Sequence, residues 1–317
     1  MDVLSFGSII ADVIVSSKQI KVQKLKNKKQ FVLDYGTKIE ASFLETTFGG
    51  SAHNIAYGIA SLGKRSGLIG AVGNDEFGQA LLNFLRQSNV NVDGIQVLEK
   101  PTGKSVVLIG EDSERTIIIY RGANDFIDAR KISKEYVNMF RYFVFTSVLG
   151  EKSIEALYKA FKYAKECGLT LIANPSAAMI REKKKDLLEL IKDSHIAIMN
   201  EEEAKLLTKK EVPKSLQSIK DLGPDTVVIT RGNKGCVAIH GTKFYEQKAY
   251  RVKVVDTTGA GDAFTSAFIF SLLRKDAMTY ALKFASVCAS LNVRSIGAVK
   301  NFPTENDILK VIGEKNV

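Results

Sequence analysis

The chain has 317 residues, of which 45% are hydrophobic and 25% charged, and its formal net charge at pH 7 is +10. These fractions are typical of a globular protein with a full core and exclude a disordered chain. The length allows one large α/β domain or two smaller ones.

The N-terminus begins with an acid and is broken by Gly7, so it favours a strand over a signal peptide. No apolar run reaches the ~18–20 residues of a membrane span, and we expect no membrane partner. Three cysteines without CxxC spacing indicate small buried residues in a reducing cytosol, and three histidines disfavour a zinc site. The cysteines are Cys167, Cys236 and Cys288, and the histidines are His53, His195 and His240. We therefore expect a cytoplasmic protein.

The basic balance is compatible with nucleic acid, an acidic membrane or a phosphorylated small molecule as partner. The lysines are scattered except for one dense run at residues 17–29. Surfaces that bind nucleic acid commonly combine basic with aromatic residues, and this run has no interleaved aromatic residues. We predict a solvated loop or edge strand there and no nucleic-acid partner.

The first 120 residues contain strand patterns separated by two helical ones. The strand patterns lie at 2–15, 31–48, 67–73 and, in several pieces, at 92–120. Apolar residues with helical spacing occur at 49–63, after a glycine pair, and at 75–89.

From residue 141 onward, strand and helix patterns alternate. Strands are predicted at 141–148, 169–174, 195–200, 225–232 and 235–240, and helices at 151–168, 184–194, from 201, and at 260–274 and 276–290. Such alternation predicts an α/β fold, with a mostly parallel sheet covered by helices. The strand-rich segments near 12–48 and 92–124 do not fit it, and we expect them to form a small projecting sheet on a single domain, 1–317.

The segment "VDTTGAGDAF" (255–264) carries the main chemical signal. A predicted strand at 250–255 ends, and an apolar helix begins at about Ala260. Unpaired amides and the dipole at a helix N-terminus favour an anion, and glycines allow a close approach of the backbone. Asp262 would repel a phosphate, but it suits a base that takes a proton from an attacking hydroxyl. The alternative is that Asp262 only caps the helix and the glycines only turn the chain.

This segment resembles the signature of the ribokinase-like (PfkB) carbohydrate and nucleoside kinases. "GGSAHN" (49–54) resembles the family's glycine pair followed by asparagine, and "IIAD" (9–12) an early substrate-binding stretch. "RGAN" (121–124), "NEEEA" (200–204) and "ITRGNKG" (229–235) are similar to further family segments in the same order. The resemblance implies a three-layer α/β/α sandwich whose projecting sheet is a lid over the sugar site.

The family's roles can be transferred to the matching positions. Asp262 is then the base, and the amides of Gly259, Ala260 and Gly261 form the anion hole for the γ-phosphate. Asn200 and Glu203 would organise Mg²⁺ and its waters, and Thr230 and Gly232 would line ATP. The resemblance assigns the sugar hydroxyls to Asp12, Gly49, Gly50 and Asn54, since a carboxylate and an amide suit a polyol.

Asp256 and Thr258 also resemble part of a monovalent-cation site, which suggests K⁺ as an additional cofactor. Its other ligands would come from 292–301, where Asn292, Ser295, Gly297 and Asn301 fall at comparable positions. The alternative is that Asp256 stabilises the turn without an ion.

Three further features are ambiguous. "TGKS" (102–105) ends like a P-loop, but Leu98 stands where that motif needs its first glycine, and we expect a turn in the lid. His53 could touch the ligand or pack within the fold. Arg121 could reach an anionic group on the substrate or form a surface ion pair.

The acceptor is predicted to be a ribose-containing small molecule, a nucleoside such as adenosine ahead of free ribose, because Ser51 replaces the lysine usual in ribokinases. The runner-up is a kinase of fructose, 2-keto-3-deoxygluconate or a phosphosugar. A non-catalytic sugar- or nucleotide-sensing member is a rival, although Asp262 is present. Since relatives often pair through their lids, a homodimer is also expected.

Overall fold

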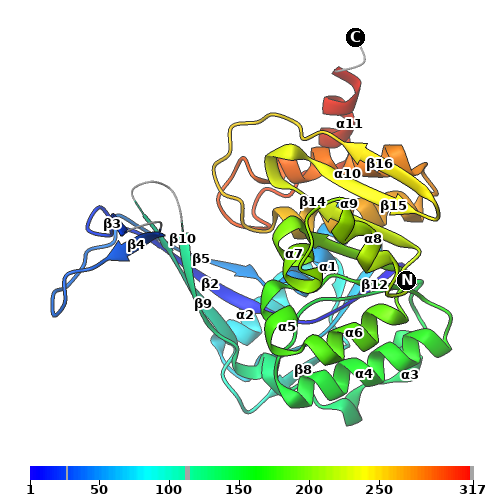
Figure 1. Ribbon diagram of the computed structural model, residues 1–317. Coiled ribbons are helices and arrows are strands. Elements are labelled where there is room, and N and C mark those ends of the chain that lie inside the picture. The colour runs from blue at the N-terminus through cyan, green and yellow to red at the C-terminus, as the bar shows by residue number, and fades with distance from the viewer. Residues whose placement is uncertain (26–27, 111–114, 315–317) are drawn as a thin grey trace.

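The computed structural model describes residues 1–25, 28–110 and 115–314 (Figure 1). Within them the central sheet has ten strands, in the order β16-β15-β14-β13-β12-β11-β1-β6-β7, with β8 also pairing with β6. The strands are β1 (Val3–Phe6), β6 (Ser66–Gly73), β7 (Val90–Asn91), β8 (Ile95–Leu98), β11 (Tyr142–Phe145), β12 (Thr170–Ala173), β13 (Ile196–Asn200), β14 (Thr226–Thr230), β15 (Cys236–His240) and β16 (Lys243–Gln247). All pairings are parallel except those of β15 with β14 and with β16.

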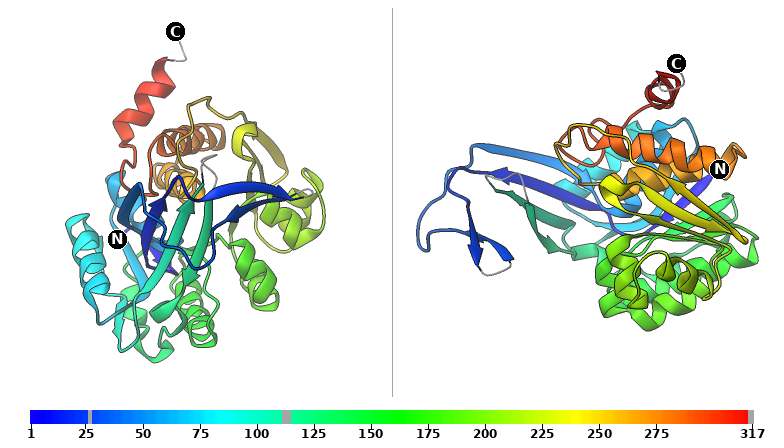
Figure 2. Two further views of the ribbon diagram at one scale, coloured as in Figure 1. Left: turned by 90° about the vertical axis from the view of Figure 1, so that its left-hand side faces the viewer. Right: turned by 45° about the horizontal axis from the view of Figure 1, so that its top comes forward.

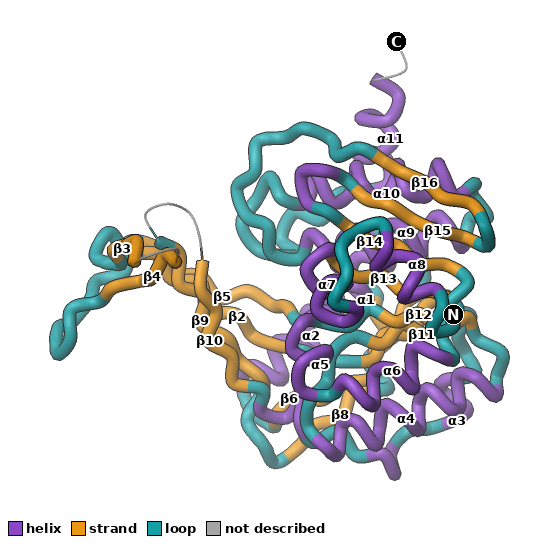
Figure 3. The backbone as a smooth tube through the Cα atoms, in the orientation of Figure 1, coloured by secondary structure: helices purple, strands orange, loops and turns teal. Residues whose placement is uncertain are grey.

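Helices cover both faces of this sheet, as predicted (Figure 3). They are α1 (Ser51–Ser61), α2 (Glu76–Gln87), α3 (Lys134–Val137), α4 (Glu151–Glu166), α5 (Ala177–Glu182), α6 (Lys184–Lys192), α7 (Glu201–Thr208), α8 (Lys214–Lys220), α9 (Ala260–Leu273), α10 (Met278–Asn292) and α11 (Glu305–Glu314). Short 3-10 helices lie at Gly122–Asp125, Ala129–Lys131 and Gly232–Lys234.

Alternate residues of the central strands face two separate cores. On one face Val144 packs with Ile55 of α1 and with Phe268 of α9. On the other, Phe143 and Phe145 pack with residues of α4. Because both faces are covered, the strands read as continuous apolar runs. The predicted three-layer α/β/α sandwich is confirmed.

A second, four-stranded sheet projects from the domain (Figure 2). Its order is β10-β9-β2-β5, from β2 (Ile10–Ser16), β5 (Phe43–Gly49), β9 (Gly103–Ile109) and β10 (Arg115–Tyr120). We call these four strands the lid. Strand β2 runs parallel to β9 and antiparallel to β5, so two distant chain segments meet at its centre.

The predicted extent of the lid needs correction. Strand β8 pairs with β6 of the central sheet, so the piece at 92–98 is not part of the lid. The basic run contributes to a separate two-stranded hairpin, β3 (Lys21–Leu25) with β4 (Lys28–Val32), rather than to a lid strand. The predicted lid segments also include residues 26–27 and 111–114, and the predicted domain 315–317, which lie outside the described residues.

The strand predicted at 250–255 is wrong, because residues 248–259 are irregular. The amides of Val255 and Asp256 both donate to the carbonyl of Val293 (2.8 and 3.2 Å), an acceptor at the end of α10 rather than on a strand. The turn predicted at "TGKS" is also wrong. Thr102 donates its hydroxyl to Asp75, the N-cap of α2, and β9 starts at Gly103.

None of the helices in the described ranges combines the length and apolar character required to cross a bilayer.

Candidate active site

A cavity of about 330 Å³ lies between the lid and the carboxyl ends of central strands. Ser8, Ser147 and Ser176, which follow β1, β11 and β12, line it, and α9 contributes Asp262. Parallel α/β sheets characteristically bind ligands at this edge. Of the predicted residues, the same cavity collects Asp12, Gly50, Asn54, Thr258, Gly259 and Asp262.

Asp262 lies in the first turn of α9, on the wall of the cavity. Burial raises its pKa to about 7, and the negative charge of Glu203 acts in the same direction. Hydrogen bonds from Asn54 and Ser51 oppose the rise because they favour the charged form. A carboxylate with a pKa near the working pH is well matched to general base catalysis.

The side-chain amide of Asn54 connects Asp262 to the interior. Its Nδ2 donates to Asp262 Oδ2 (2.8 Å), while its Oδ1 faces His53 Nδ1 (3.1 Å). His53 is fully buried and stacks on Phe84 at 5.8 Å between ring centroids. Burial lowers its pKa to about 4, so the ring is neutral, and an Nδ1–H facing Asn54 Oδ1 leaves Nδ2 of that amide to face Asp262.

The structure therefore resolves the ambiguity at His53 in favour of packing, since the ring is not among the residues that line the cavity. It also places the polar atoms of Asn54 against Asp262 and His53. The contact between Asn54 and a sugar hydroxyl stays a prediction.

Asp12 is held in β2 on the cavity face of the lid. It accepts a hydrogen bond from Ser105 of β9, its register partner, and burial raises its pKa. A Cβ at Gly49 would stand 2.2 Å from Asp12 Oδ2, and one at Gly50, whose φ is +97°, would stand 2.4 Å from the Ser8 carbonyl. The glycine pair is thus needed to fit Asp12 and to enter α1.

The predicted anion hole lies at the N-terminus of α9, where Gly259 is the N-cap with φ of 73°. A Cβ there would stand 2.5 Å from that of Ala298, so glycine is required. The Ala260 amide donates to the Thr257 carbonyl over a long 3.3 Å. Within the described residues no acceptor is found for the amides of Gly259 and Gly261. These two amides fit an anion site better than that of Ala260.

A second, smaller cavity of about 100 Å³ is also lined by Asp262. It is lined by Asn200, Glu203, Thr230 and Gly261, which were predicted to contact nucleotide and Mg²⁺. Asn200 and Glu203 form a capping box at the start of α7, each side chain bonded to the other residue's amide at 2.8 Å. Gly232 lies in an exposed 3-10 turn, outside both cavities.

The residues present are compatible with Mg²⁺ bound through phosphates. The described residues contain no cluster of three or more His, Cys, Asp or Glu side chains able to hold a metal ion. Mg²⁺ needs no such cage, since it keeps several waters and takes one or two carboxylates with substrate phosphates. Glu203, whose pKa is raised by burial, borders the smaller cavity and could meet such an ion or its waters.

Sequence reasoning missed Arg115, the first residue of β10 in the lid. It lines the main cavity and its Nη1 lies 3.1 Å from Asp256 Oδ1. No local pattern signals this residue, which is 141 positions from its partner and is followed by an ordinary strand. Arg121 also lines the cavity and lies 3.7 Å from Glu182, so both predicted roles remain open to it.

Residues 2–305 match the family model described as pfkB family carbohydrate kinase. The chain belongs to this family. The match covers both the lid and the α9 turn, so Asp12, the glycine turn and Asp262 all lie within the matched region. The protein is a phosphotransferase of the sugar-kinase type, whose acceptor is a hydroxyl group.

Curated relatives are named for several different sugars. A ribokinase of Haemophilus influenzae is 28% identical over 284 residues, covering 87% of this chain and 91% of the relative. A 5-dehydro-2-deoxygluconokinase of Clostridium perfringens is 32% identical over 286 residues, covering 83% of each. A probable fructokinase of Arabidopsis thaliana is 31% identical over 282 residues, 82% of this chain and 73% of the relative. The family is therefore shown, while its members' names leave the acceptor open.

Solved structures share the fold across the whole chain. The ribokinase of Arabidopsis thaliana complexed with ribose and ATP superposes with a TM-score of 0.82 at 25% identity, covering 98% of each chain. A ribokinase of Thermotoga maritima gives 0.84 at 21% identity, covering 99% of each. An Escherichia coli neighbour, with a TM-score of 0.83 and 22% identity over 99% of each chain, holds ATP and Mg²⁺.

Proposed function

We propose that this protein transfers the γ-phosphoryl group of ATP to a primary hydroxyl of a small ribose-containing substrate, with Asp262 as general base. The observation that carries the proposal is the position of Asp262 between two cavities, one lined by lid residues and the other by Asn200, Glu203 and Thr230. An acceptor in the first cavity and a donor in the second would meet at this carboxylate.

Each of the chain's own groups has a defined task in this proposal. Asp262 takes the proton of the acceptor hydroxyl, and Asn54 holds the carboxylate in place through its 2.8 Å hydrogen bond. The amides of Gly259 and Gly261 and the dipole of α9 stabilise negative charge on the migrating group. Asp12 would bind sugar hydroxyls from the lid side. Bound ATP with Mg²⁺ would supply the phosphoryl group and the charge neutralisation.

An apolar wall of the main cavity favours a nucleoside over free ribose. Ile10, Val107, Ile117 and Ile119 present aliphatic side chains from the lid to the cavity. A free pentose is polar over its whole surface. The flat ring of a nucleobase, in contrast, could bury one face against these aliphatic side chains.

A second candidate, a sugar acid, is favoured by Arg121. Its guanidinium borders the cavity, and its partner Glu182 is 53% exposed, so the pair is too weak to prevent exchange for a substrate carboxylate. The 32% identity to a 5-dehydro-2-deoxygluconokinase supports the same class. Fructose and a phosphosugar remain further alternatives.

A panel of nucleosides, ribose, fructose, 2-keto-3-deoxygluconate, 5-dehydro-2-deoxygluconate and phosphosugars tests these candidates with ATP consumption as the readout. We expect the highest kcat/KM for a nucleoside. A preference for a sugar acid that is lost in Arg121→Ala would favour the second candidate. No turnover with any acceptor, from folded protein that binds ATP, would support a sensing member instead.

A homodimer through the lid is part of the proposal. The lid face opposite the cavity carries Ile118 and Val106 in one row with Val13, and Leu44 and Tyr120 lie in adjacent rows. Ile118, Leu44 and Tyr120 are 60%, 63% and 56% exposed. An apolar sheet face of this kind favours burial against a second copy of the same face.

A cytoplasmic location is also part of the proposal. The three cysteines are unpaired, which is compatible with the reducing conditions of the cytoplasm.

A further inference from the structure

The Asp256 carboxylate, just before α9, receives its charge partner from the lid. Arg115 Nη1 lies 3.1 Å from Asp256 Oδ1 and 2.8 Å from the hydroxyl oxygen of Thr257. The two side chains of the ion pair are only 28% and 12% exposed. Solvent therefore screens the pair less than it screens a surface salt bridge.

The other groups around Asp256 are also hydrogen-bond donors. The Thr258 amide and hydroxyl donate to Oδ1 at 2.9 and 2.6 Å, and the Gly297 amide donates to Oδ2 at 3.0 Å. With Arg115 the carboxylate accepts four hydrogen bonds, about as many as it has lone-pair sites. Asp256 thus has its charge balanced by Arg115, and protein groups already donate three hydrogen bonds to Oδ1 and one to Oδ2.

A monovalent cation, which the family resemblance suggests here, does not fit this arrangement. A cation needs oxygen lone pairs directed towards it, whereas Gly297 directs an N–H group at Asp256 and Thr258 directs its hydroxyl proton there. Ser295 Oγ is oriented towards the Asn292 carbonyl at 3.5 Å, and Asn301 is exposed. A cation beside Asp256 would also meet the like charge of Arg115.

We propose that the Arg115 guanidinium takes the place of a monovalent cation at the Asp256 turn, so that phosphoryl transfer by this protein does not depend on K⁺. The guanidinium supplies one fixed positive charge, and its bond to Thr257 holds a second point of the turn. Asp256 in turn fixes the amide and hydroxyl of Thr258, the residue before the N-cap Gly259. Arg115 is in this way a positioning residue for the anion-binding end of α9.

Because the positive charge at Asp256 comes from a lid residue, it also connects the lid to the α9 turn. A bound ion would be held by the α9 turn and the 292–301 segment, whereas Arg115 belongs to β10 of the lid and also borders the substrate cavity. Asp12 of the lid is close enough for the charge of Asp256 to raise its pKa further, and both carboxylates line a cavity with Arg115. The Arg115–Asp256 pair therefore links the sugar-binding strands directly to the turn that holds the γ-phosphate.

The inference rests on the proposed function, and its first test needs no variant. The wild-type kcat, with the best acceptor of the panel, is measured in KCl, NaCl and choline chloride at equal ionic strength. We expect the three rates to agree within about twofold, because the charge at Asp256 is covalently supplied. Activation by K⁺ of about fivefold or more would overturn the inference.

Variants test whether the charge of Arg115 is used. In Arg115→Ala we expect kcat to fall about 10- to 100-fold, since the α9 turn loses its counter-charge. Millimolar guanidinium ion, which has the shape and charge of the lost group, should restore at least about fivefold. Arg115→Lys, which keeps the charge, should retain more activity than Arg115→Ala. A kcat of Arg115→Ala within twofold of wild type, or no recovery with guanidinium, would contradict the role.

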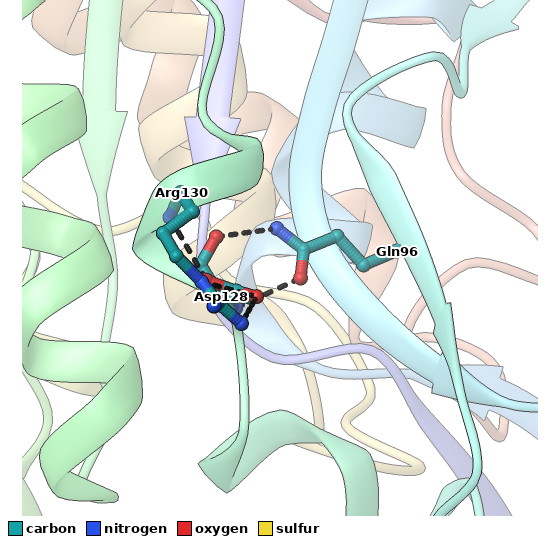
Figure 4. Close-up of polar contacts among 3 residues, drawn as sticks. All are labelled: Gln96, Asp128 and Arg130. Atoms are coloured by element: carbon teal, nitrogen blue, oxygen red, sulfur yellow. Dashed lines mark hydrogen bonds and ion pairs between the residues drawn. The ribbon is translucent and has the colours of Figure 1, made fainter.

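The matched control is another arginine–aspartate pair, Arg130 with Asp128, which Gln96 also contacts (Figure 4). Its Nη2–Oδ2 distance is 2.8 Å, Arg130 is 90% exposed, and neither residue lines the main cavity. Arg130→Ala should leave kcat unchanged and show no guanidinium effect. An equal loss in both variants would assign the Arg115 effect to general destabilisation and overturn the inference.

A readout independent of turnover separates this inference from the proposed function. The melting temperature of the wild type is compared in KCl and in choline chloride, and we expect the same value within about 1 °C. A rise specific to K⁺ would show a bound cation and overturn the inference even for an active kinase. Equal melting temperatures without turnover on any acceptor would support the replacement of the cation by Arg115 and contradict the proposed phosphoryl transfer.

Discussion

Asp262 is half-buried yet bordered by two cavities, and its properties follow from that position. Burial raises the pKa to about 7, so near neutral pH the carboxylate is present in both protonation states. Only the ionised form can accept the proton of a hydroxyl group. The rate of the reaction should therefore depend on pH through this one side chain.

We expect kcat/KM to fall about tenfold per pH unit below about pH 7, as Asp262 becomes protonated in the free enzyme. Asp262→Asn should abolish phosphoryl transfer, by at least about a thousandfold, while ATP binding measured by calorimetry is retained. A variant that turns over at the wild-type rate would show that another group is the base.

Asn54→Ala is expected to move the acid limb of the pH–rate profile to higher pH. The Asn54 hydrogen bond stabilises the ionised carboxylate, so its loss raises the pKa of Asp262 further. The shift is read from kcat/KM between pH 5 and 9, with Asn74→Ala, which removes a surface amide paired with Glu99, as the control. An unchanged limb would mean that Asn54 does not act on the base.

The two glycines at the start of α9 should respond differently to alanine. Gly261 has open space where a Cβ would lie, and alanine in a helix stabilises by about 0.5–1 kcal/mol, so Gly261→Ala should fold with an unchanged or higher melting temperature. It should still lose activity about tenfold or more, because the methyl group obstructs the phosphate. Gly259→Ala should lower the melting temperature, since φ there is +73° and Ala298 is in the way. Full activity in folded Gly261→Ala would remove that amide from the anion site.

At the scale of elements, the sequence predicted those with strong periodicity and missed those fixed by distant contacts. The central strands before and after α4 were predicted because burial on both faces leaves unbroken apolar runs. The strand at 250–255 failed because Val254 and Val255, apolar enough for a strand, have no strand beside them and are 55% and 45% exposed. The helices α8 and α11 and the edge strand β16 were not predicted; α8 has only seven residues and β16 only five.

The candidate site shows the same division. Asp12, Asn54 and Asp262 were found because each sits in a compact local motif, and the structure brings them to one cavity. The contacts of Arg115 and the bond between His53 and Asn54 could not be found that way. The first depends on how the lid is placed against the α9 turn, and the second on a ring orientation set by packing on Phe84.

The lid as an element should control the oligomeric state. Ile118→Lys places a charge on the exposed apolar face of the lid. We expect the wild type to elute as a dimer and this variant as a monomer. Light scattering coupled to size-exclusion chromatography measures the mass. Met139→Lys, at an apolar residue that is 44% exposed and outside the lid, is the matched control. A wild-type mass of one chain would contradict the lid dimer.

For the whole molecule, the raised pKa of Asp262 has a cost in stability that grows with pH. The folded state holds the proton up to about pH 7 and the unfolded chain releases it near pH 4, so the contribution of this group to stability decreases between these values. Asp262→Asn removes that effect. Its free energy of unfolding relative to wild type should increase between pH 4 and 7 by up to about 1.4 kcal/mol per pH unit.

Urea unfolding at pH 5 and pH 8 measures the difference. We expect Asp262→Asn to be more stabilising at pH 8 than at pH 5, with Asp34→Asn, at an exposed residue, as the control. An equal effect at both values would mean that the carboxyl is not perturbed in the folded protein.

The order of the strands and helices along the chain also bears on synthesis. Asp12 and Asn54 belong to the first fifth of the polypeptide, whereas α9 and α10, which pack with α1 on one face of the central strands, lie in the last fifth. A ribosome-bound chain can thus assemble most of the sheet while α1 alone covers the face that α9 and α10 later complete. Such an intermediate would expose apolar surface and be prone to aggregation, so it would need a chaperone or rapid completion of the chain. It would also lack Asp262 and could not yet use that carboxylate in a reaction of ATP.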